Sequence, residues 1–216
     1  MKQIIILGAS SVYGVGAKYG WADLVKSYVH ASQYAADGPG EYCEVFNFAK
    51  SGSTVEFVAN VFPWVCEHYQ RGPELTTIVS VGGNDAKASN SPDNYVCTPE
   101  DFRKKMLSLC TTLKAQSKRV IFMSNGYLDE AKLNPKINPF NASRSYFTNA
   151  RRNQFNAITK EICDSLGFEF VANECDQATW TREYLYKDGL HPNQKGHELM
   201  FEALKPKLDE ILIDKG

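Results

Sequence analysis

Hydrophobic residues lie along the chain in short runs, and longer segments of helical periodicity separate these runs. The runs cover residues 3–7, 44–48, 76–81, 119–123 and 168–171. Continuous apolar runs of this length are typical of strands that are buried on both faces of a parallel sheet. The pattern therefore predicts five buried, parallel strands.

The segments between the runs are predicted to be helical, and they cover residues 21–34, 55–69, 98–115, 146–166 and 194–212. The clearest helix start is Thr98-Pro99-Glu100-Asp101. A threonine caps the first turn, a proline suits the first helical position, and acids face the positive end of the helix dipole. We also expect Pro63 to kink or end the first half of its helix.

Alternating strands and helices predict an α/β fold with three layers, in which helices cover both faces of a parallel sheet. The length of 216 residues favours one domain over residues 1–216. Two irregular stretches, 86–97 and 125–143, each follow a predicted strand. Ligands bind beyond the carboxyl ends of strands in such sheets, so we expect substrate contacts in these loops.

Composition excludes several other classes of protein. A formal net charge of -1 gives no electrostatic reason to expect nucleic acid or an anionic membrane as a partner. The six cysteines form no CxxC pair, which argues against a zinc or redox site and for free thiols. No apolar run reaches the ~18 residues of a membrane span, and the N-terminus lacks the form of a signal peptide. We therefore expect a cytoplasmic protein without an integral membrane segment.

Four short segments supply residues for a hydrolytic site. They are GASSVYG after the first predicted strand, NFAKSGST after the second, VGGND after the third, and DGLHPN before the last helix. GASS and GGND alone are ordinary turn sequences, and DGLHPN, a stronger signal, also fits a loop in which Pro192 opens a helix. Their joint occurrence, at strand ends and before a helix, points to one functional site.

These segments resemble the four blocks of the SGNH hydrolases, also called the GDSL esterase/lipase family. The blocks carry Ser, Gly, Asn and His in that order, and here they match Ser10, Gly52, Asn84 and His191. Asp188 matches the aspartate that completes the triad. The resemblance implies a flavodoxin-like sandwich with five parallel strands in the order 2-1-3-4-5.

The resemblance also implies the chemistry. Ser10 would be the nucleophile, His191 its base, and Asp188 the group that orients the histidine. The backbone N–H groups of Ser10 and Gly52 and the side-chain amide of Asn84 would form an oxyanion hole. No metal or organic cofactor is expected. The substrate would be a small or medium acyl ester, such as an O-acetylated carbohydrate or a lysophospholipid.

One position departs from the family pattern. The residue after the first glycine is usually aspartate, and here it is Ala9, which leaves open what holds the nucleophile loop. Ser11 is a neighbouring hydroxyl that must be excluded, although Gly8 and Gly14 fix the register on Ser10. Two alternatives to a hydrolase remain, namely an acyltransferase that uses the same site and a non-catalytic binding domain with this fold. The oligomeric state is left open.

Other motifs favour structural roles. The glycines from Gly14 onward lie too far from the strand for a dinucleotide-binding loop. The Arg151-Arg152 pair is expected on a solvated helix face. Trp180, Tyr184 and Tyr186 either line a pocket or pack.

Overall fold

The computed structural model describes residues 1–37, 42–138 and 141–213. Its main sheet has five parallel strands in the order β2-β1-β3-β5-β8. Counted along the chain, this is the predicted order 2-1-3-4-5. The strands are β1 (Lys2–Gly8), β2 (Cys43–Asn47), β3 (Leu75–Ser80), β5 (Arg119–Met123) and β8 (Glu169–Val171).

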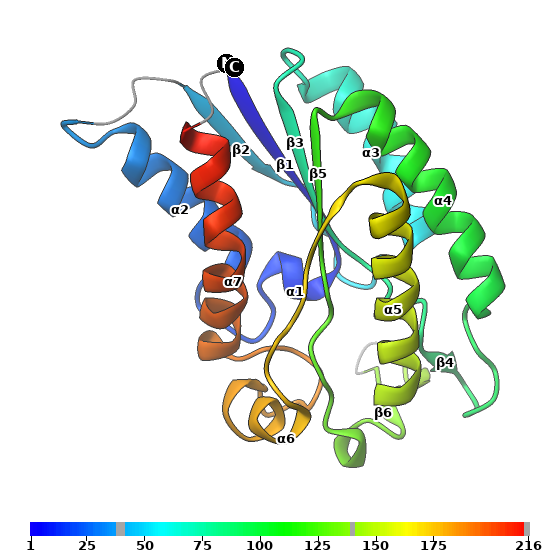
Figure 1. The fold of residues 1–216 in the computed structure, drawn as a ribbon. Helices are drawn as coiled ribbons and strands as arrows, with labels where there is room; N and C mark the ends of the chain where they lie inside the picture. Colours follow the sequence, from blue (N-terminus) through cyan, green and yellow to red (C-terminus); the bar gives the residue numbers. More distant parts are fainter. Residues whose placement is uncertain (38–41, 139–140, 214–216) are drawn as a thin grey trace.

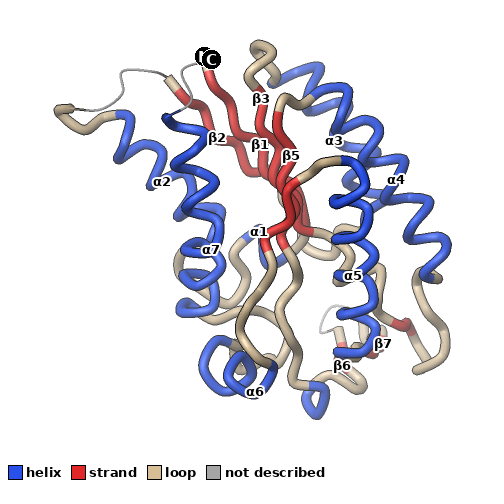
Figure 2. Tube along the Cα trace, in the orientation of Figure 1, coloured by secondary structure: helices blue, strands red, loops and turns tan. Residues whose placement is uncertain are grey.

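Helices cover both faces of this sheet, as predicted (Figures 1 and 2). One face carries α2 (Trp21–Gln33) and α7 (Gln194–Ile213), and the other carries α3 (Val55–Tyr69), α4 (Pro99–Gln116) and α5 (Asn149–Leu166). Shorter turns complete the chain: α1 (Ser10–Tyr13), η1 (Glu130–Lys132), α6 (Gln177–Thr179) and the π-helical turn η2 (Trp180–Tyr184).

Strand β1 shows why the sheet needs two covering layers. Every residue of β1 is buried. Because successive side chains of a strand point to opposite faces, Ile5 and Leu7 enter the core beneath α3 and α4, whereas Ile4 and Ile6 enter the core beneath α2 and α7. The continuous apolar run in the sequence thus supplies both cores at once.

Helix boundaries follow the local signals in the sequence. The Thr98 hydroxyl accepts a hydrogen bond from the Asp101 N–H at 3.1 Å, as the capping prediction requires. Gly167 ends α5 with a φ of 71°, which a glycine adopts without a steric penalty. The prediction for Pro63 is wrong in one respect, because α3 continues through this proline to Tyr69.

The structure adds a second, small sheet that the sequence pattern did not predict. It is antiparallel, in the order β4-β7-β6, and lies at the lower end of the molecule in Figure 2. Its strands are β4 (Ala88–Ser89), β6 (Lys136–Ile137) and β7 (Arg144–Tyr146). Two of them come from the stretches expected to be irregular, and β7 includes Tyr146, where the prediction began a helix. Thr148 caps that helix instead, through the Arg151 N–H.

Candidate active site

The four predicted segments meet at the carboxyl edge of the main sheet. Ser10 begins α1 directly after β1, Gly52 lies in the loop between β2 and α3, and Asn84 follows β3. His191 lies in the loop before α7. Parallel strands end at the same edge of a sheet, so residues far apart in the sequence come together there.

Ser10, His191 and Asp188 form a continuous hydrogen-bonded chain. The Ser10 Oγ lies 2.8 Å from the His191 Nε2, and the His191 Nδ1 lies 2.6 Å from the Asp188 Oδ2. The histidine thus contacts the hydroxyl with one ring nitrogen and the carboxylate with the other. This is the arrangement in which an imidazole can accept a serine proton while a carboxylate fixes its orientation.

Backbone interactions hold the turn that carries Ser10, which answers the question raised by Ala9. The Ala9 carbonyl accepts hydrogen bonds from the N–H groups of Val12 and Tyr13, at 3.1 and 3.0 Å. Val12 is fully buried, and its carbonyl accepts a hydrogen bond from the Asn47 side chain at 3.2 Å. An aspartate at position 9 is therefore not needed to fix this turn.

Gly8 permits a close approach between this turn and β3. A Cβ at position 8 would lie 2.3 Å from the Ser80 carbonyl oxygen and 2.4 Å from the Val12 Cγ2. No side chain fits into this space, so the turn packs directly against the neighbouring strand.

Ser11 lines the same pocket as Ser10, but in the described part of the chain its hydroxyl is not hydrogen-bonded to His191. Within the described residues, the His191 Nε2 is hydrogen-bonded to the Ser10 hydroxyl and not to that of Ser11. The register obtained from Gly8 and Gly14 therefore agrees with the geometry.

Asn84 lines the same pocket as Ser10, and Gly52 lies in the loop before α3. The Asn84 Nδ2 donates to the Ser53 carbonyl at 3.0 Å, and this bond uses one of the two hydrogens of the amide. Gly52 has a φ of 85°, and a Cβ there would meet nothing within 4 Å. The N–H groups of Ser10 and Gly52 donate to no other residue in the described part of the chain. Both are therefore free to bind a negatively charged oxygen.

Asp85 connects the loop after β3 to the start of α3. Its buried carboxylate accepts hydrogen bonds from the Val55 N–H at 3.2 and 3.1 Å. Burial raises the pKa of Asp85 to about 6, against backbone hydrogen bonds that lower it. Asp85 thus orders the loops around Asn84, and it forms no hydrogen bond with His191 among the described residues.

Lys136, which the sequence analysis did not single out, binds Asp188, the carboxylate of the hydrogen-bonded chain. The Lys136 Nζ lies 2.9 Å from the Asp188 Oδ2, and the N–H groups of Leu190 and His191 donate to the Asp188 Oδ1 at 3.0 and 3.1 Å. Burial alone would raise the pKa of Asp188. The hydrogen bonds from His191, Lys136 and the backbone outweigh burial and hold this pKa well below its usual range. Asp188 is therefore a stable carboxylate.

The pocket beside Ser10 is small, with a volume of about 40 Å³. Its apolar wall includes Tyr127, Phe147, Trp180 and Leu190. Of the three aromatic residues before the Asp188 loop, only Trp180 lines this pocket. The prediction for Arg152 is wrong, because this residue is 8 % exposed and lines the pocket instead of lying on a solvated face.

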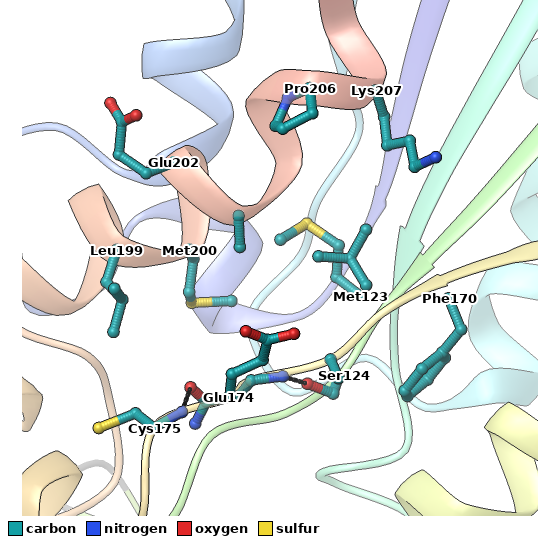
Figure 3. Close-up of a pocket in the computed structure, with 14 residues that line it drawn as sticks. Met123, Ser124, Phe170, Glu174, Cys175, Leu199, Met200, Glu202, Pro206 and Lys207 are labelled. Carbon is teal, nitrogen blue, oxygen red and sulfur yellow. Dashed lines mark hydrogen bonds between the residues drawn. The ribbon is translucent and has the colours of Figure 1, made fainter.

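A second and larger cavity lies between α7 and the end of β8, with a volume of about 480 Å³ (Figure 3). Leu199 and Met200 enter it from α7, and Phe170 enters it from β8. Met200 also lines the pocket beside Ser10, so it forms a wall between the two spaces.

Among the residues that the structure describes, no three His, Cys, Asp or Glu side chains are grouped so that they could hold a metal ion. Within the same residues, no helix has both the length and the apolar character needed to cross a membrane.

Comparisons with known proteins agree with the fold and identify the family. Residues 6–199 match the model of the GDSL-like lipase/acylhydrolase family. A search of curated protein sequences found no match. Among solved structures, a lipase/acylhydrolase from Enterococcus faecalis is 19% identical, with a TM-score of 0.73 and full coverage of both chains.

Two other structural relatives have more specific descriptions. The psychrotrophic esterase EstA from Pseudoalteromonas sp. is 16% identical, with a TM-score of 0.66 over 97% of this chain and 98% of its own. An acetylxylan esterase from Geobacillus stearothermophilus is 17% identical, with a TM-score of 0.67 over 96% of this chain and 94% of its own. The chain belongs to the GDSL-like lipase/acylhydrolase family, and it is a carboxylic ester hydrolase of this family.

Proposed function

We propose that the protein hydrolyses esters of short acyl groups through an acyl-enzyme on Ser10. The observation that carries the proposal is the hydrogen-bonded chain from Ser10 through His191 to Asp188, with distances of 2.8 and 2.6 Å. Free donors beside Ser10 complete the set of groups that acyl transfer requires.

The reaction would proceed in two halves. The Ser10 Oγ attacks the acyl carbon while its proton moves to the His191 Nε2, and the N–H groups of Ser10 and Gly52 and the Asn84 amide bind the resulting oxyanion. The intermediate collapses, the C–O bond to the alcohol breaks, and His191 gives its proton to the departing oxygen. Water then attacks the acyl-enzyme with His191 again as base, the bond between the acyl carbon and the Ser10 Oγ breaks, His191 returns the proton to the Oγ, and the carboxylic acid leaves.

The size of the pocket supports a short acyl group. A cavity needs roughly 10–15 Å³ to hold one water molecule. The pocket of about 40 Å³ therefore holds roughly three non-hydrogen atoms. An acetyl group has this size, whereas a fatty chain requires space that lies beyond Met200. Acetyl esters of carbohydrates, one of the substrate types suggested by the sequence, fit this pocket better than lysophospholipids do.

The test measures kcat/KM on 4-nitrophenyl acetate and 4-nitrophenyl octanoate. We expect the wild type to prefer the acetate, and we expect Ser10→Ala to lower kcat on the acetate by at least about 10,000-fold. Ser11→Ala is the matched control, and it should stay within a few-fold of the wild type. A preference for octanoate would contradict the short-acyl proposal, and full activity of Ser10→Ala would contradict the role of Ser10.

A further inference from the structure

A buried arginine without an acidic partner lies in the wall of the candidate active site. Arg152, in the first turn of α5, is 8 % exposed. No carboxylate among the described residues forms an ion pair with it. Burial lowers the pKa of Arg152 to about 10, so the side chain is still a cation at neutral pH. Buried charges are normally paired, because leaving one unpaired costs several kcal/mol.

The hydrogen bonds of Arg152 leave much of the guanidinium unused. The Nη1 donates to the Gly126 carbonyl at 2.8 Å. The Nε is buried without a partner, and the Nη2 donates to none of the described residues. A guanidinium carries five N–H donors, so the contact with Gly126 satisfies only a small part of its capacity.

The unused edge of Arg152 lies beside the groups that would bind the reacting ester. The Nη2 would be 3.4 Å from a Cβ at Gly83, the residue that precedes Asn84. Because Gly83 has no side chain, nothing from that residue covers the Nη2. Arg152, Gly83 and Asn84 line the same pocket as Ser10 and His191.

The preceding arginine shows what a purely structural arginine looks like in this helix. Arg151 donates from its Nε to the Ala86 carbonyl at 2.9 Å and from its Nη2 to the Cys97 carbonyl at 2.7 Å. Its guanidinium also lies 3.7 Å from the centre of the Tyr95 ring. Arg151 therefore fastens the loop before α4, whereas Arg152 keeps donors free inside a catalytic pocket.

We propose that Arg152 binds an anionic group of the substrate, so that the preferred substrates are esters that carry a carboxylate close to the scissile bond. The proposal rests on the proposed esterase function and adds a substrate class to it. A carboxylate accepts two parallel hydrogen bonds from a guanidinium, which gives geometric selectivity as well as attraction. The carboxylate can belong to the acyl group or to the alcohol, because both parts of the ester would lie against the pocket wall that contains Arg152.

The test uses two matched pairs of esters that differ only in charge. Monoethyl malonate and ethyl malonamate place the carboxylate or its neutral amide on the acyl side. Acetoxyacetate and acetoxyacetamide place it on the alcohol side. For the pair that Arg152 recognises, we expect Arg152→Met to lower the ratio of kcat/KM, anionic over neutral, by roughly 10- to 100-fold.

Two variants control this measurement. Arg151→Met removes the same charge from the adjacent position and should leave the ratio unchanged. Arg152→Lys keeps the charge but loses the two parallel N–H donors of the guanidinium. Its ratio of kcat/KM, anionic over neutral, should therefore lie between those of the wild type and Arg152→Met. If Arg152→Met fails to fold, inhibition of the wild type on 4-nitrophenyl acetate replaces it. Malonate should then inhibit roughly tenfold more strongly than the neutral diamide malonamide.

The outcomes separate this proposal from the proposed function. If Arg152→Met lowers kcat/KM equally for charged and neutral esters, or if malonate and malonamide inhibit equally, Arg152 stabilises the oxyanion or the fold, and the anion proposal is wrong. The esterase function would still stand in that case. If the wild type hydrolyses none of the four esters nor 4-nitrophenyl acetate, the esterase function itself fails.

Discussion

The two sides of the candidate active site are held by different kinds of interaction. On the side of Ser10, backbone hydrogen bonds to the Ala9 carbonyl and close packing at Gly8 set the turn. On the side of His191, the Asp188 carboxylate accepts hydrogen bonds from the histidine ring, the Lys136 ammonium and two backbone N–H groups. The nucleophile side thus depends on shape, and the histidine side depends on charge.

This difference explains why the chain tolerates alanine at position 9. A turn that is fixed by backbone geometry needs small residues in the right places more than it needs a particular polar side chain. A histidine that must change its protonation state during the reaction needs a charged partner instead. Changes on the two sides should therefore produce different losses, one of stability and the other of rate.

The largest effect is expected from Asp188→Asn. The amide keeps the shape of the side chain but removes the charge that orients and stabilises His191, so kcat should fall by roughly 1,000- to 10,000-fold. The measurement is steady-state hydrolysis of 4-nitrophenyl acetate. Asp129→Asn, in the neighbouring loop, is the matched control and should keep the wild-type rate. A loss of less than tenfold in Asp188→Asn would mean that charge does not control the histidine side.

Gly8→Ala tests the other side. Its Cβ would lie 2.3 Å from the Ser80 carbonyl oxygen, so β1 and the following turn must shift. We expect the free energy of unfolding to fall by about 1–3 kcal/mol, measured by urea denaturation. Gly72→Ala is the control, since a Cβ there meets nothing within 4 Å and φ is not positive. Equal stability of the two variants would show that shape does not hold the nucleophile turn.

Two carboxylates near the site, Asp85 and Asp188, should give the stability opposite dependences on pH, because the pKa of Asp85 is raised and that of Asp188 is lowered. Burial raises the pKa of Asp85 to about 6 in the folded protein, above its unfolded value of 3.8. The folded state therefore binds this proton more tightly, and the contribution of Asp85 falls by about 2–3 kcal/mol as pH rises from about 4 to above 6. Asp85→Asn should remove this decline, so its stability relative to the wild type should rise with pH in urea titrations. A difference that is constant between pH 4 and 7 would contradict the assignment.

The smallest effect is expected from Lys136→Met. Its ion pair with Asp188 is partly exposed, with side-chain exposures of 30% and 25%, so it should contribute no more than about 1 kcal/mol. Without the lysine, the pKa of Asp188 rises toward its ordinary value, and the stability that this carboxylate confers is lost at a higher pH during acid titration. Acid unfolding followed by circular dichroism measures the shift. Lys132→Met, whose lysine pairs with Asp129, should leave the acid transition unmoved.

The sequence predicts the main sheet well because strands depend on local signals, and its resemblance to the SGNH blocks selects residues that the structure brings together. Five apolar runs correspond to five strands, and Ser10, Asn84 and His191 lie at strand ends or before a helix. The sheet β4-β7-β6 was missed because its strands have two or three residues each and pair across long separations. No periodicity can develop over such lengths.

Lys136 and Arg152 were missed for a related reason. Each is a single basic residue whose role depends on what the folded chain places beside it, namely Asp188 for one and Gly83 for the other. Two adjacent arginines on a helix usually indicate a solvated surface. Here Arg151 points to the loop before α4 and Arg152 to the pocket, and a helical pattern alone does not distinguish these surroundings.

The most direct test of the central claim is covalent labelling with a fluorophosphonate, mapped by peptide mass spectrometry. The reagent reacts only with a serine whose hydroxyl is activated by a base, so it reports the contact between Ser10 and His191 without assuming a substrate. We predict one label on Ser10 in the wild type and in Ser11→Ala, and no label in Ser10→Ala. A label on Ser11, or ester hydrolysis without any label, would contradict the account.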